Sequence, residues 1–328
     1  MSEDNKINGR VIANARVTGL LNTVIKRVDG VAVNTTAFST GLLDTYGSAA
    51  AAYSVRRLNS SYTGACMRVR ESGGNTETDI GFNSAGNLDV LAIRDHCGSN
   101  GGYVRYWYDQ STAGGTGSGN DAGQATSSLQ PQIYNGTAVL TQNGKPALDF
   151  EMDHNFLLSA TLTNNIGVFS VLENATQTND GSIHRPFFAQ IDTDPFVVDS
   201  TGYSVGLARD GSDGIRYGIA NENGSGILEL AITKTTDDTQ ILVTALAENG
   251  TANLYVDGGS NVNTTYTPRT SGYTTQYAIG VGDTATNLSK IPTRRYQGKI
   301  QEIVAFNVAQ SSNRTGIETN IITYFNIP

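Results

Sequence analysis

Residues 241–258 read ILVTALAENGTANLYVDG, two apolar stretches separated by an Asn-Gly pair. Asn249 and Gly250 both tolerate the positive φ that a tight hairpin turn demands. The stretches on either side, Ile241–Leu246 and Thr251–Gly258, have the apolar and β-branched residues that strands favour. This segment therefore predicts an antiparallel β-hairpin.

The second half of the chain repeats this organisation, with short apolar runs between Gly, Asn and Asp turns. Further candidate strands are Val168–Leu172, Tyr203–Leu207, Gly226–Leu230 and Tyr296–Phe306, the last with Ile300, Ile303 and Val304 toward the core around a possible bulge. Upstream, Cys66–Glu71 and Val104–Tyr108 alternate apolar with polar residues, as half-exposed strands do. Strands at this spacing predict a β-sandwich.

Two segments favour helices. The alanine run within Ser48–Leu58 predicts a short helix, because alanine has the highest helix propensity. Arg314–Phe325 places Ile317, Ile321 and Phe325 at the spacing of one helical face. We expect this second helix to close the sandwich.

Composition narrows the possible partners. The net charge is −8 and only 16% of residues are charged, which argues against a nucleic-acid partner. No apolar run is long enough to insert into a bilayer, and MSEDNKINGR is not a secretion signal, so we expect synthesis in a cytoplasm. Cys66 and Cys97 lack metal-site spacing and are expected to be reduced thiols.

Residues 1–45 differ from the rest. Val11–Val17 and Val24–Val28 are short apolar pieces that lack a core of their own. They form either an edge strand of the main domain or an arm that anchors the protein in an assembly. The sequence thus predicts an anchoring arm over 1–45 and one domain over 46–328.

Several motifs then appear in a specific order: Ala51–Arg57 (AAYSVRR), Trp107–Ser111 (WYDQS), Gly119–Ala122 (GNDA) and Asn143–Leu148 (NGKPAL). In this order the chain resembles the catalytic domain of the family 54 α-L-arabinofuranosidases (arabinofuranosidase B). Val243 to Phe325 is similar to laminin G-like and other lectin-like domains, as found in tailed-phage virion proteins. Both resemblances imply an all-β, concanavalin A-like (jelly-roll) sandwich. With the two features argued above, the expected fold is this sandwich with an extended N-terminal arm and a short C-terminal helix.

The enzyme resemblance also implies a site. Asp283, in the glycine-rich segment Ile279–Asp283, corresponds to the family's acid/base aspartate, and is the one candidate for ligand binding or catalysis. The family's nucleophilic glutamate corresponds to Val205, which cannot attack a sugar. Retaining hydrolysis needs two carboxylates, so the resemblance predicts a chain that is not an enzyme.

Other chemistry has weaker support. His96, His154 and His184 have no spacing for zinc or a catalytic triad, so we expect no metal site and no cofactor. Calcium binding is one interpretation of Asp192–Asp194 and Asp210–Gly214, but aspartates in such loops more often belong to ordinary solvated turns. Gly114–Gly119 lacks the lysine of a phosphate loop, and Trp107 is expected in the core.

These features predict a structural protein of a tailed-phage virion, in the head decoration, tail or fibre. Its arm would bind other virion proteins, its sandwich would bind a host-surface glycan, and it would form homo-oligomers. The alternatives are a glycoside hydrolase of the α-L-arabinofuranosidase type, with Asp283 as acid/base, and a free carbohydrate-binding module.

Overall fold

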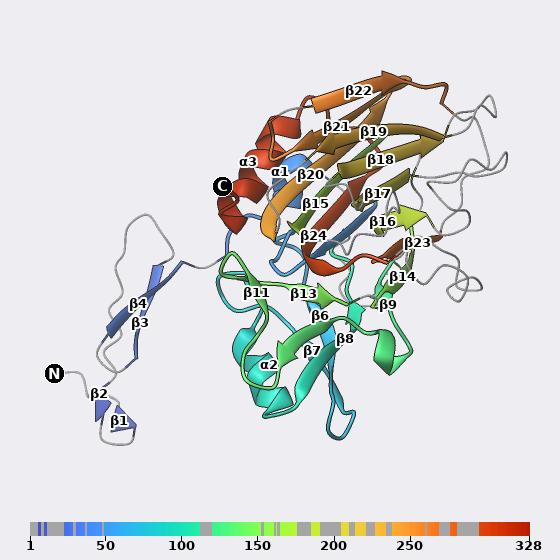
Figure 1. The fold of residues 1–328 in the computed structure, drawn as a ribbon. Coiled ribbons are helices and arrows are strands. Elements are labelled where there is room, and N and C mark those ends of the chain that lie inside the picture. Colours follow the sequence, from blue (N-terminus) through green and yellow to red (C-terminus); the bar gives the residue numbers. More distant parts are fainter. Residues whose placement is uncertain are drawn as a thin grey trace.

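A computed structural model gives the fold (Figure 1). It describes residues 6–7, 10–11, 23–28, 31–36, 38–47, 49–111, 120–151, 154–160, 162, 165–175, 185–190, 205–209, 214–220, 227–233, 238–259, 261–268, 276–280 and 295–328. Side chains are described from residue 38 onward, except at strand residues Gln190, Val205, Gly206, Arg209, Ala220, Ile227 and Gln276. In the described part of the chain, antiparallel strands far outnumber helices, which confirms the predicted all-β sandwich with a C-terminal helix.

The first sheet has β15 at its centre, paired with β20 on one side and β24 on the other. β21 and β22 extend it beyond β20, and β5 pairs with the far edge of β24. Its strands are β5 (Ala51–Ser54), β15 (Ile166–Asn174), β20 (Thr239–Glu248), β21 (Thr251–Val256), β22 (Asn261–Thr265) and β24 (Gly298–Phe306).

The opposing strands run in the order β14, β23, β16, β17, β18 and β19. Their bounds are β14 (Phe156–Ser159), β16 (Arg185–Gln190), β17 (Val205–Arg209), β18 (Gly214–Ala220), β19 (Ile227–Thr233) and β23 (Gln276–Ile279).

A third group of strands adjoins both. β9 joins β14 to β8, and β13 joins β10 to β24. The group comprises β6 (Met67–Glu71), β7 (Glu77–Ile80), β8 (Gly101–Trp107), β9 (Ala122–Gly123), β10 (Gln132–Asn135), β11 (Thr141–Gln142), β12 (Lys145–Pro146) and β13 (Leu148–Phe150), with helix α2 (Val90–Cys97) and the 3₁₀ turn η1 (Ser127–Leu129).

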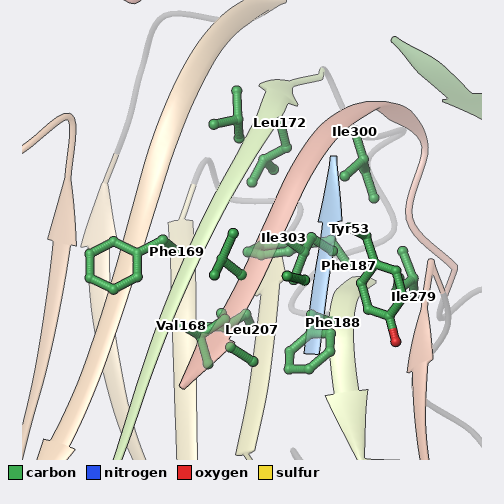
Figure 2. Packing of buried hydrophobic residues seen from close by; sticks show 14 of the residues in the cluster. Tyr53, Val168, Phe169, Leu172, Phe187, Phe188, Leu207, Ile279, Ile300 and Ile303 are labelled. Atoms are coloured by element: carbon green, nitrogen blue, oxygen red, sulfur yellow. The ribbon is translucent and has the colours of Figure 1, made fainter. Parts of the chain in front are cut away.

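The core lies between the two larger sheets. Figure 2 shows Val168, Leu172 and Ile303 on the β15 and β24 side, and Phe188 and Leu207 on the β16 and β17 side. Every residue of β15 is buried. One face of that strand packs on the opposing sheet. Figure 1 shows helix α1 (Leu42–Tyr46) and helix α3 (Arg314–Phe325) beside β20, on the outer side of the first sheet.

Local sequence signals are confirmed where they are strongest. β20 and β21 form the predicted hairpin, with Asn249 at φ +50° and Gly250 at φ +80°. α3 spans the predicted range, with Ile317, Ile321 and Phe325 buried. β24 has the expected bulge, because Glu302 pairs with Val171 while Ile300 pairs with Leu172.

The helix predicted over Ser48–Leu58 is wrong. Ala51–Ser54 form strand β5, which pairs with Glu302 to Ala305 of β24 and is buried at every position. Helix propensity differs by only about 0.7 kcal/mol per residue among ordinary side chains. A strand position that buries Tyr53 completely and satisfies the backbone outweighs that preference.

Among the described strands, the N-terminal ones pair only with one another. β1 (Lys6–Ile7) pairs with β2 (Arg10–Val11), and β3 (Thr23–Val28) pairs with β4 (Val31–Thr36). Figure 1 draws the β3–β4 hairpin apart from the sandwich. The division at residue 45 stays a prediction, although Leu42 and Leu43 already belong to the sandwich core.

The Trp107–Ser111 motif is part of the scaffold. Trp107 is fully buried, as predicted, and packs on Tyr53 and Phe156. The Asp109 carboxylate accepts hydrogen bonds from the amide of Ala52 and from Ser111. The Gln110 side chain bonds the backbone of Ser54, Arg56 and Leu58. The motif thus ties β5 to the end of β8.

Candidate functional site

Asp283 lies outside the described residues, but the backbone that leads to it is described. Gly280 follows β23 and has φ +85°. Its amide donates to the Phe187 carbonyl, and its carbonyl accepts from the Tyr296 amide. A Cβ at position 280 would lie 2.6 Å from Cδ1 of Phe150 and 2.8 Å from the carbonyl oxygen of His154. Only glycine fits here, so the segment with Asp283 starts from a fixed point.

Val205 is the first residue of β17, and its side chain is outside the described part. Gly206 pairs with Ala189 of β16, which pairs with Ala278 of β23. Because Gly280 bonds Phe187, the register puts Val205 and Gly280 at opposite ends of this three-strand unit. The assignment of Val205 to the position of the family's nucleophile stays a prediction.

Carboxylates are scarce on the described strands around this edge. Across β14, β16 to β19 and β23, the one carboxylate is Glu229, whose Oε1 lies 2.8 Å from Nη1 of Arg216. The connecting segments are richer in acids by sequence: Asp180, Asp192, Asp194, Asp199, Asp210, Asp213, Glu222 and Asp283. A second carboxylate for Asp283 would therefore come from a connection and not from these strands.

A buried cation lies at the same edge. Arg185 begins β16 and is 2% exposed. Its guanidinium donates to the carbonyl of Arg295 and to Oε1 of Gln297. Both residues follow the segment with Asp283 in the sequence. Burial lowers the pKa of the neighbouring Arg295. Two arginine residues, one of them fully buried, thus lie at the edge where β23 ends.

The other predicted residues are dispersed. The half-buried His96 contacts the Thr76 carbonyl, and His154 lies 8% exposed between β13 and β14. His184, Asp192–Asp194, Asp210 to Asp213 and the phosphate-loop candidate Gly114–Gly119 lie outside the described residues. Within the described part, no cluster of three His, Cys, Asp or Glu residues suits a metal ion.

The two cysteine thiols are unreactive by their surroundings. Cys66 and Cys97 are free and buried. Burial raises the pKa of the Cys66 thiol and raises that of Cys97 to about 11, so both are poor nucleophiles.

In the part of the chain that is described, every helix is too short or too polar to cross a membrane.

The chain matches solved protein structures, although its sequence matches no family model and no curated protein. Among solved structures, an arabinofuranosidase complexed with arabinofuranosyl-α-1,2-xylobiose matches 84% of this chain and 62% of its own, with TM-score 0.61 and 19% identity. A family 54 α-L-arabinofuranosidase soaked with a cyclic sulfate inhibitor matches 86% of this chain and 64% of its own, with TM-score 0.60 and 18% identity.

A Glu→Gln mutant of a family 54 α-L-arabinofuranosidase, soaked with 4-nitrophenyl α-L-arabinofuranoside, gives the same coverage with TM-score 0.61 and 18% identity. This chain therefore spans less than two thirds of the length of these structures. At such identity the likeness shows the fold. It confirms the resemblance to the family 54 sandwich, while the laminin G-like and phage parts of the resemblance are not shown.

The comparison contradicts the prediction that the chain is not an enzyme, because the structures that share its fold over most of its length are enzymes. The physical weakness of the prediction was its dependence on one aligned position. At 18 to 19% identity a shift of a few residues moves a different side chain into that position. The acidic connections offer other carboxylates.

Proposed function

We propose that this chain recognises glycans that carry arabinofuranosyl groups, at the edge where β23 ends and the segment with Asp283 begins. The supporting observation is Gly280. Its backbone is held by hydrogen bonds to Phe187 and Tyr296, and close packing against Phe150 and His154 excludes a larger residue. A loop with a fixed start can hold a carboxylate against a sugar.

The chemistry of Asp283 suits a sugar ligand. An ionised carboxylate accepts two hydrogen bonds and so can bind neighbouring hydroxyl groups, and such charge-assisted bonds are about twice as strong as neutral ones. Guanidinium groups of the kind found at this edge donate to ring and hydroxyl oxygens. The fold likeness to arabinofuranosidases supports the arabinofuranosyl class.

Hydrolysis of such a glycan is the second candidate function. The observation that favours it is the number of acidic residues in the connections beside β16, β17 and β18. Retaining hydrolysis needs two carboxyl groups roughly 5 Å apart, one as nucleophile and one as general acid/base. Asp283 would be the acid/base residue, and the nucleophile would come from one of these connections.

One titration tests the first proposal. Isothermal titration calorimetry with arabinofuranosyl-α-1,2-xylobiose compares the full chain, Asp283→Asn and the control Asp95→Asn, which removes an exposed carboxylate from α2. We expect binding by the full chain and the control, with at least about tenfold weaker binding by Asp283→Asn. Absence of binding by the full chain, or equal binding by Asp283→Asn, contradicts the proposal.

Hydrolysis has its own readout. Release of 4-nitrophenol from 4-nitrophenyl α-L-arabinofuranoside is followed for the same three proteins. Hydrolysis by the full chain and Asp95→Asn, lost in Asp283→Asn, supports the second candidate. Equal rates in all three proteins contradict it, as does the absence of any release.

We further propose that residues 1–45 attach the protein to a larger assembly, such as a tailed-phage particle, where copies associate and present the sandwich to a host-surface glycan. The support is that β1 to β4 pair among themselves and with no described strand of the sandwich. Mass spectrometry of purified particles from the source tests this. The chain is expected in them, and its absence contradicts the proposal.

A further inference from the structure

A row of polar side chains crosses four neighbouring strands of the third group and reaches β24. Arg70 of β6 pairs with Tyr103 of β8, and Tyr103 pairs with Gln132 of β10. Gln132 pairs with Asp149 of β13, and Asp149 pairs with Lys299 of β24. Directly paired residues lie on the same face of a sheet. The register therefore gathers on one face five side chains that are distant in sequence.

This face points away from the core. Residues that flank the row along the same strands, Val104, Ile133, Leu148 and Ile300, are buried in the core. Tyr103, Gln132, Asp149 and Lys299 are half-buried, so the row lines the surface. At its end, Nζ of Lys299 lies 3.2 Å from Oε2 of Glu173. The Glu173 carboxylate thus balances the positive charge of Lys299 at this end of the row.

A pocket of about 350 Å³ opens over the other end of the row. Its lining includes Arg70, Tyr103 and Gln132 of the row, together with Glu151 and His154. The remaining lining residues are Ser72, Ser127 and Ser128. The Glu151 side chain is exposed and has no ion pair or hydrogen bond within the described part of the chain.

Two buried groups of this lining keep hydrogen-bonding atoms that have no partner among the described residues. Arg70 is 8% exposed and uses three of its five N–H groups, on Gln130, Asn75 and the Ser127 carbonyl. All three acceptors are neutral. The Arg70 guanidinium carbon also lies 5.1 Å from the centre of the Tyr103 ring, so the cation and the ring form one recognition surface.

His154 supplies the second buried group that can form a hydrogen bond. The amide of Glu151 lies 3.1 Å from Nδ1 of His154, and the Asp149 carbonyl lies 3.2 Å from the same atom. The amide can only donate and the carbonyl can only accept, so Nδ1 bonds one or the other according to the tautomer, and Nε2 is left to donate or accept. Among the described residues Nε2 has no hydrogen-bond partner, while the side chain is 8% exposed and lines the pocket.

The pocket therefore combines an aromatic ring, N–H and O–H groups, and the carboxylate of Glu151. Beside it in the row, burial raises the pKa of Asp149, and Lys299 opposes the shift. Sugar hydroxyl groups both donate and accept, and sugar C–H faces pack on aromatic rings. A strongly anionic ligand would meet Glu151, and a cation would meet Arg70.

We propose that this pocket is a binding subsite for one unit of a neutral oligosaccharide, with Glu151 and His154 bonding its hydroxyl groups and Tyr103 packing against its ring. The subsite is separate from Asp283 in the residues that form it, although the backbone of His154 touches Gly280. It stands on its own geometry, and its test does not depend on the proposed function.

Calorimetric titration with the neutral trisaccharides xylotriose, cellotriose and maltotriose, and with anionic trigalacturonate, tests the subsite. The full chain is compared with Glu151→Gln, Tyr103→Leu and the control Glu248→Gln, which removes an exposed carboxylate at the β20–β21 turn. Circular dichroism confirms that each variant is folded. Asp283→Asn is included, so that loss at this pocket is distinguished from loss at the proposed arabinofuranosyl site.

We expect at least one neutral trisaccharide to bind the full chain, Glu248→Gln and Asp283→Asn alike. Glu151→Gln should weaken that binding about tenfold or more, and Tyr103→Leu should weaken it as well. Failure of all three neutral sugars to bind, equal binding by Glu151→Gln, or binding of trigalacturonate alone would overturn the proposal.

Discussion

The carbonyl oxygen of His154 lies 2.8 Å from the position that a Cβ on Gly280 would occupy. This contact brings together the two regions to which we assign ligand binding, the pocket with Glu151 and the turn that leads to Asp283. Both depend on the same close approach of two backbones. The contact therefore predicts that one methyl group will disturb both.

Gly280→Ala should be strongly destabilising. Its φ of +85° costs an alanine about 1–2 kcal/mol, and the overlap with Phe150 and His154 adds about 1–3 kcal/mol. Gly144→Ala is the matched control, because Gly144 has φ +76° but nothing within 4 Å of an added Cβ. Urea unfolding measures both variants. Equal losses would show that packing at Gly280 is not tight.

Glu302 is the centre of a buried ion pair that connects β5, β24 and α3. Its carboxylate accepts from Nε and Nη2 of Arg56 at 2.8 and 2.9 Å and from the Ser54 hydroxyl at 2.6 Å. Arg56 also donates to Asn320 of α3. Glu302→Gln leaves a buried cation without its anion, so we expect a loss of about 3–5 kcal/mol in the free energy of unfolding.

The exposed pair Arg68 and Asp79 is the control for this prediction. Both of its side chains are more than a third exposed, so Asp79→Asn should cost under about 1 kcal/mol. Urea denaturation at pH 7 compares the two variants. A loss for Glu302→Gln as small as that for Asp79→Asn would mean that the Arg56 pair adds no stability.

Glu71 predicts a specific dependence of stability on pH. Its carboxylate accepts from the amides of Gly73, Gly74 and Thr76, and these bonds lower the pKa of Glu71 to about 2. A lowered pKa in the folded state gives stability that is present above the ordinary pKa of glutamate. That stability is lost as the pH falls from about 4.5 toward 2.

The measurement is the melting temperature of the full chain and of Glu71→Gln between pH 2 and pH 7. We expect Glu71→Gln to melt lower at pH 7 and the difference to shrink toward pH 2. Glu77→Gln, on the exposed strand β7, should show little difference at either end. A Glu71→Gln difference that is constant across this range would refute the assignment.

The N-terminal boundary is tested by two deletions. Leu42 and Leu43 of α1 are 1% and 5% exposed, and burying a leucine stabilises a fold by roughly 1.5–3 kcal/mol. Removal of residues 1–37 should leave the melting temperature of the sandwich nearly unchanged, whereas removal of 1–45 should lower it clearly. Similar melting temperatures for the two deletions would place the core boundary after α1.

The sequence predicted those elements whose signals are local. The β20–β21 hairpin follows from Asn249 and Gly250, and α3 follows from the spacing of Ile317, Ile321 and Phe325. Ala51–Ser54 could not be predicted in this way, because pairing with β24 decides its state. The pocket was missed for a related reason: Arg70, Tyr103, Gln132 and Glu151 come from separate segments, and only strand register brings them together.

Ligand soaking of crystals of the full chain with arabinofuranosyl-α-1,2-xylobiose tests most directly whether this sandwich is a glycan-recognising protein. We expect electron density for the sugar along the edge shared by His154 and Gly280, with hydroxyl groups within about 3 Å of carboxylate oxygens. Sugar bound only on another face, or no sugar at saturating concentration, would contradict it.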